Sequence, residues 1–97
     1  MTFAELKGNT FWIDYKTYSE DVLTSADSIS IIIKDSAGTT ISSWTITDTD
    51  EVNELETGWY QVKIDSSSLT SGGRYSIQFV CVIDSNPFTR LDYIEVI

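Results

Sequence analysis

The side chains that could do chemistry in this 97-residue chain are mostly carboxylates. The sequence has no histidine and one cysteine, which excludes Ser-His-Asp and Cys-His catalysis and histidine-based metal sites. Cys81 has the inward parity of a predicted strand, where a buried and unreactive thiol is expected. No glycine-rich phosphate loop occurs. The sequence therefore predicts neither an enzyme nor a bound cofactor.

The acidic segment 48–56 is the candidate for a metal site, because it holds five carboxylates and no base. Asp48, Asp50 and Glu51 form a candidate calcium site, since Ca²⁺ binds several oxygens that converge from a loop. The spacing resembles the start of an EF-hand loop, but no glycine follows at the sixth position. A solvated acidic loop beside an edge strand explains the same residues, and the incomplete ligand pattern favours it.

Three tryptophans need an explanation. Trp44 shares a strand face with Ile46, and we expect it in the core. Trp12 and Trp59 lie opposite the apolar faces of their predicted strands. They could form a sugar-binding platform or anchor an interface. They could equally fold over a sheet edge and cover the core, because indole is amphipathic. The sequence leaves these interpretations open.

The elements that must position these residues are strands, because period-2 alternation recurs and helical periodicity is nearly absent. Main strands are expected at 10–16, 27–34, 40–47, 58–65, 73–84 and 88–97. Short strands are expected near 52–55 and at 2–6. This spacing predicts one domain over residues 1–97 with an antiparallel β-sandwich of six or seven short strands.

The last predicted hairpin has apolar residues on both faces. Val80 and Val82 point outward from the first strand, and Leu91 and Tyr93 are apolar positions of the second. A sheet of a lone sandwich alternates apolar and polar residues, so these four positions predict a second buried face against a partner. Scattered surface hydrophobes are the alternative, because β-branched residues favour strands anyway.

The net charge of −9 limits the partners. An acidic field repels phosphate backbones, so nucleic-acid binding is not expected. No signal peptide is visible at the N-terminus, and no apolar run approaches the ~20 residues of a membrane span. We therefore expect no membrane partner. The acidity favours solubility, and adaptation to high salt would also account for it.

The stretch from Leu69 through Gly72 and Gly73 to Tyr75, with Trp44 on an earlier strand, carries a resemblance. It resembles the Leu…Gly…Tyr corner of immunoglobulin-like and fibronectin-III-like domains. The resemblance implies an antiparallel immunoglobulin-like β-sandwich of about seven strands. It also implies that the hydroxyl of Tyr75 bonds to backbone just upstream.

Three further segments, 35–38, 58–64 and 69–79, are similar to the small Ig-like modules of tailed-phage virion proteins. This resemblance implies a structural or assembly protein of a phage particle, in head decoration, head–tail connection or the tail. It would lie in the virion and bind capsid, portal or tail proteins in multiple symmetric copies. Such modules also occur in adhesins and bacterial surface proteins, so a carbohydrate-binding or adhesive module is the alternative.

Overall fold

The computed structural model describes residues 2–5, 10–65, 69 and 73–96. These residues form strands and no helix. The strands are β1 (Thr2–Glu5), β2 (Thr10–Lys16), β3 (Tyr18–Ser19), β4 (Val22–Leu23), β5 (Ser28–Lys34), β6 (Thr40–Thr45), β7 (Val52–Glu56), β8 (Trp59–Asp65), β9 (Gly73–Ile83) and β10 (Asn86–Val96). The predicted all-β class is confirmed.

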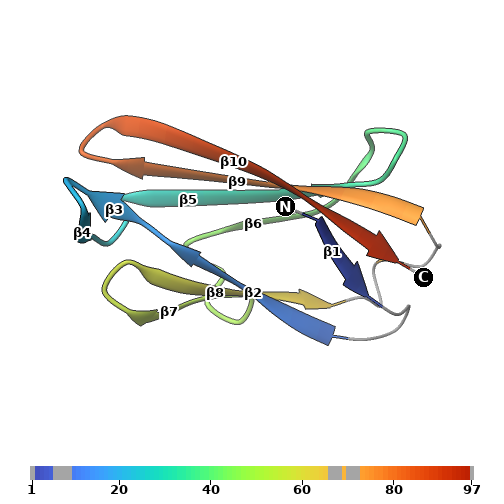
Figure 1. Cartoon of the computed structure of the whole chain (residues 1–97), viewed down its shortest axis with the longest axis horizontal. Coiled ribbons are helices and arrows are strands. Elements are labelled where there is room, and N and C mark those ends of the chain that lie inside the picture. The colour runs from blue at the N-terminus through green and yellow to red at the C-terminus, as the bar shows by residue number, and fades with distance from the viewer. Residues whose placement is uncertain (1, 6–9, 66–68, 70–72, 97) are drawn as a thin grey trace.

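Two sheets pack against each other (Figure 1). One has the order β1-β10-β9-β5-β6 and the other has the order β2-β8-β7. The pairs are antiparallel except β1 with β10, which is parallel. In immunoglobulin lettering, β2, β8 and β7 are strands B, E and D, and β10, β9, β5 and β6 are G, F, C and C′. The predicted Ig-like sandwich is therefore confirmed, and its seven main strands match the expected number.

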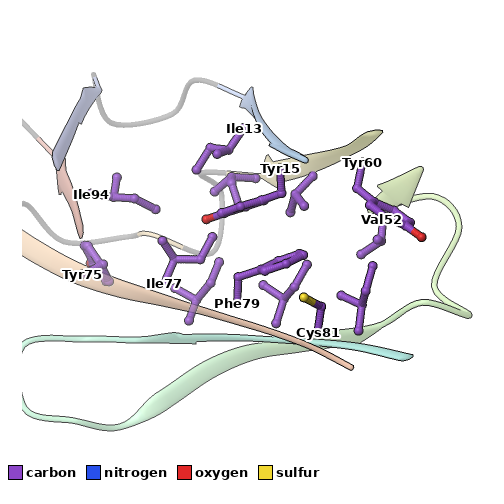
Figure 2. Packing of buried hydrophobic residues seen from close by; sticks show 14 of the residues in the cluster. Ile13, Tyr15, Val52, Tyr60, Tyr75, Ile77, Phe79, Cys81 and Ile94 are labelled. Carbon is purple, nitrogen blue, oxygen red and sulfur yellow. The ribbon is translucent and has the colours of Figure 1, made fainter. Parts of the chain in front are cut away.

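Alternation along the strands fills the space between the sheets (Figure 2). On β9 every second residue from Tyr75 to Ile83 is buried. The rings of Tyr15 and Phe79 stack across the core, with centroids 4.2 Å apart. Trp44 packs against this core but is only partly buried, so the expectation for it is met in part. The fully buried aliphatic residues, which are less than 2% exposed, are Ile31, Ile33, Val62, Ile64, Leu69, Ile77 and Ile94.

The corner around Tyr75 is described only in part. Leu69 is 0% exposed and Tyr75 is 6% exposed, so both belong to the core. Residues 66–68 and 70–72, where the backbone partner of the Tyr75 hydroxyl was expected, lie outside the described residues.

The β3–β4 hairpin was not predicted, and it lies near the β7–β8 and β9–β10 turns at one end of the sandwich (Figure 1). Gly58 in the β7–β8 turn has φ +74°, and a Cβ there would lie 2.7 Å from the backbone nitrogen of Thr24. Glu54 accepts hydrogen bonds from the Ser25 hydroxyl (2.6 Å) and the Gly58 amide (3.1 Å). The Ser25 hydrogen bond is the main reason that the pKa of Glu54 is lowered. These close contacts fix the hairpin, and with it Tyr18, against the sandwich.

Candidate functional site

The four apolar residues of the last hairpin lie on the outer face of the five-stranded sheet. Val80, Val82 and Tyr93 are half-buried, and Leu91 is 49% exposed. Gln78 of β9 lies between Leu91 on one side and Ile32 of β5 on the other, so Ile32 extends the apolar surface to a third strand. We call the outward positions of β5, β9 and β10 the outer patch.

The outer patch contrasts in charge with the chain that carries it. The chain has 15 acidic residues, yet Glu95 is the only acid at the outward positions of these three strands. Two bases, Lys34 and Arg74, lie there, and the Arg74 guanidinium is 4.1 Å from the centroid of the Tyr93 ring. The other outward positions are uncharged: Ser28, Ser30, Ile32, Ser76, Gln78, Val80, Val82, Pro87, Thr89, Leu91 and Tyr93. The uncharged part of the patch can therefore be buried without burying a charge.

Trp12 and Trp59 lie on the other sheet, so the structure divides the predicted interface residues between two surfaces. Trp12 is 55% exposed and pairs with Lys63 in the β2–β8 register. Trp59 is half-buried, and the Lys16 ammonium lies 4.9 Å from its ring centroid. Its indole nitrogen has no hydrogen-bond partner among the described atoms. In this register Trp12 and Trp59 lie four positions apart along the β2–β8 pair, so the two rings do not form one continuous aromatic platform.

The calcium candidate is not assembled. One oxygen of the Asp48 carboxylate accepts a hydrogen bond from the Thr45 amide (2.7 Å), and the Asp48 carbonyl accepts one from the Glu51 amide (3.1 Å). Asp48 therefore closes the turn between β6 and β7. Within residues 10–65, 69 and 73–96, no three acidic or cysteine side chains come close enough together to hold a metal ion. Asp48, Asp50 and Glu51 are therefore not grouped as metal ligands in the structure, and a turn hydrogen bond uses the carboxylate of Asp48.

A groove that sequence reasoning missed runs along one open side of the sandwich, between β2–β3 and β10. It consists of three adjoining hollows of about 340, 220 and 320 Å³. Neighbouring hollows share walls: Tyr15 and Arg90 border the first two, and Tyr18 and Phe88 border the last two. Tyr18 is 50% exposed and Phe88 is 53% exposed, so large aromatic rings flank the groove. We call this surface the β2–β10 groove.

A buried carboxylate closes one end of the groove. Asp92 is 1% exposed, and it accepts hydrogen bonds from the Tyr15 hydroxyl (3.0 Å) and the Arg90 Nε (3.2 Å). Burial raises the pKa of Asp92, but the hydrogen bonds that it accepts, those of Tyr15 and Arg90 among them, outweigh burial and lower the pKa. Burial is also the main reason that the pKa of Tyr15 is raised. This cluster fixes side chains of β2 and β10 at the edge of the groove.

The signals for these residues were present in the sequence but weak. Asp92 has the same parity as Ile94 and Val96, so an acid at an inward position marks a buried polar contact. Cys81, in contrast, was placed correctly: it is 5% exposed, and burial raises the pKa of its thiol. No helix long and apolar enough to cross a membrane occurs in the described part of the chain.

Comparison with known proteins supports the β-sandwich fold. No protein-family model and no curated protein sequence matches the chain. Among solved structures, the chain is similar to the endo-beta-1,4-mannanase from Thermotoga petrophila, with a TM-score of 0.69 and 10% sequence identity. The match covers 98% of this chain and 17% of the mannanase chain. At this identity the likeness shows a shared β-sandwich fold alone.

Proposed function

We propose that this protein is a non-enzymatic structural module of a tailed-phage particle. It acts by packing its outer patch against other virion proteins. The observation that carries the proposal is the outer patch itself, an apolar and hydroxyl-rich sheet face with one acid in a chain of net charge −9. The resemblance of segments 35–38, 58–64 and 69–79 to virion modules supplies the phage context.

The charge distribution favours assembly over free existence in solution. Copies of a strongly acidic protein repel each other when they are placed side by side. A contact face with a single acid, Glu95, lets such a protein sit in a crowded symmetric array, while the acidic surface faces solvent or a basic partner. Val80, Leu91 and Ile32 would then supply the apolar centre of the contact, and the surrounding Ser, Thr and Gln its polar rim.

Incorporation into particles tests the proposal. We expect the protein to be found in purified particles of the phage that encodes it. Leu91→Asp and Val82→Lys place opposite charges on the outer patch, and both should abolish incorporation if the patch is buried. Leu55→Asp is the matched control, because Leu55 is also exposed but lies on β7 of the three-stranded sheet, away from the outer patch.

Wild-type protein that is absent from the particles would contradict the proposal. So would outer-patch variants that are incorporated as well as the control. Circular dichroism and thermal unfolding of each variant show whether the monomer is still folded, so that a loss of incorporation is assigned to the contact.

The alternative, a carbohydrate-binding or adhesive module, has less support. Lys16 lies over one ring face of Trp59, which leaves Trp12 as the tryptophan with the exposed ring. A glycan array probed with wild type and Trp12→Ala separates the two functions. Sugar binding that is lost in Trp12→Ala would favour the alternative.

A further inference from the structure

We infer that the β2–β10 groove binds an extended segment of a partner protein, which adds as a strand to the edge of β10 at residues 86–91. Alternate side chains of this segment enter the three hollows. The inference goes beyond the proposed function, because the groove and the outer patch lie on different surfaces of β10. Single substitutions can therefore test them separately.

The two edges of β10 are paired unequally. Its whole length, Asn86–Val96, pairs with β9 on one side. On the other side β1 pairs with Tyr93–Val96 alone, so residues 86–91 have no partner there among the described strands. On the opposite side of the groove, β2 is the edge strand of the three-stranded sheet. An unpaired strand edge offers backbone donors and acceptors to an incoming strand.

The three hollows are evenly spaced along β10. The first lies between Asp92 and Arg90, the second between Arg90 and Phe88, and the third between Phe88 and Asn86. The hollows therefore repeat every two residues of a strand, or about 6.6 Å. Alternate side chains of a strand added beside β10 repeat at the same distance, so each inward side chain meets one hollow.

The three hollows differ in the chemistry of their lining residues. Tyr15, Phe79 and Cys81 contribute to the lining of the middle hollow, which suits an aliphatic side chain. Three acidic residues, Glu20, Asp21 and Asp84, line the hollow at the Asn86 end, which suits a basic side chain. The hollow at the other end contains ionised and amide groups, among them Arg90, Asp14 and Gln61, which suit a polar side chain.

The occupant is therefore an extended protein segment with a basic, an aliphatic and a polar residue at alternate positions. Charge complementarity sets its orientation, because the basic residue must lie at the acidic end. The strand would also cover part of the exposed rings of Tyr18 and Phe88, which lie beside the middle hollow. Removing such apolar area from water favours binding.

A displayed library of nine-residue peptides, in which threonine alternates with a randomised residue, tests the inference on the untagged 97-residue protein. We expect enrichment of a basic, an aliphatic and a polar residue at successive randomised positions. An enriched peptide, labelled with a fluorophore, should bind in solution and shift the amide resonances of residues 86–91 in a ¹⁵N spectrum. Phe88→Asp should weaken it by about tenfold or more, because a charge then borders the apolar hollow.

Leu91→Asp is the matched control and should leave peptide affinity unchanged, since Leu91 belongs to the outer patch. A second variant, Asp84→Lys, changes the charge of the acidic hollow and leaves the middle hollow unaltered. Peptides selected on this variant should no longer carry the basic residue. No enrichment over an unrelated β-sandwich would overturn the inference. Peptides that bind wild type and Phe88→Asp equally would also overturn it, as would binding of an oligosaccharide panel in this groove without peptide enrichment.

Discussion

The two halves of β10 belong to one strand of one sheet, yet they have different surroundings. Residues 86–91 are all exposed, and Leu91 and Phe88 are each about half accessible to solvent. In the second half, Asp92, Ile94 and Val96 are buried, and β1 pairs along the strand edge. The pairing with β9 is the same throughout, so it does not cause the difference. What also differs is the strand edge: among the described strands, β1 pairs with Tyr93–Val96 and none pairs with residues 86–91 on that side. The second half contributes to the core, and the first half is exposed to solvent.

The largest loss of stability is expected for a substitution in the second, buried half of β10. Ile94 is 0% exposed, and Ile94→Ala should lower the free energy of unfolding by about 3 kcal/mol, because it leaves a cavity between the sheets. Phe88→Ala on the other half should change it by less than about 0.5 kcal/mol. Urea unfolding followed by tryptophan fluorescence measures both. Equal losses at the two positions would show that the halves contribute alike to stability.

The next effect concerns the buried charge at the junction. Asp92→Asn should lower the free energy of unfolding by about 2 kcal/mol, because the hydrogen bonds that Tyr15 and Arg90 donate lose a charged acceptor. The folded pKa of Asp92 lies below its ordinary value of 3.8, so its contribution is present above that pH and is lost as pH falls through the folded pKa. Unfolding measured from pH 6 to pH 2 should therefore show a shallower acid loss in the variant. If Asp92→Asn lost stability in acid as steeply as wild type, groups other than Asp92 would cause the pH dependence.

A smaller effect is expected at the hydroxyl that faces Asp92. Tyr15→Phe should cost about 1 kcal/mol, because one hydrogen bond to the buried carboxylate disappears. The pKa of Tyr15 is raised above its ordinary value of 10.0, so its contribution is present below that pH and is lost as pH rises towards the folded pKa. Thermal unfolding between pH 8 and pH 11 should thus be less alkali-sensitive in Tyr15→Phe. The same alkaline loss in both proteins would contradict this assignment.

The smallest effect belongs to the residue between the two halves. Arg90 pairs with Asp92, but its own side chain is 56% exposed, so solvent screens much of the interaction. Arg90→Gln should cost about 0.5 kcal/mol, and the difference from wild type should shrink in high salt. Unfolding at low and high sodium chloride checks this. A cost as large as that of Asp92→Asn would mean that the ion pair, and not the tyrosine hydrogen bond, anchors the carboxylate.

Much of the sandwich could be predicted because most of the long strands, such as β5, β8 and β9, bury one face. Period-2 alternation placed Ile31, Val62 and Ile77 inward, and burial of all three at 0–1% exposure confirms it. The same parity placed Val80 and Val82 outward. Local pattern was sufficient here, because a strand cannot shift by one residue without exposing its whole apolar set.

The groove could not be predicted, because it depends on contacts between distant segments. Tyr18 and Phe88 are 70 positions apart in the sequence, and no local pattern indicates that they border one hollow. The β3–β4 hairpin was missed for a local reason. Its turn residues, Glu20 and Asp21, both have positive φ without the glycine that usually marks such a turn. The positions of Asp48, Asp50 and Glu51 show that carboxylates close in sequence need not converge in space.

The parallel pairing of β1 has a practical consequence for anyone who handles this protein. Thr2 lies opposite Tyr93, and β1 runs in the same direction as β10. An affinity tag fused ahead of β1 would therefore emerge next to the open edge of β10 and be tethered there at a high effective concentration. Such a tag would compete with any ligand of the groove and hide it in a binding screen. A tag at the other terminus would leave the edge accessible.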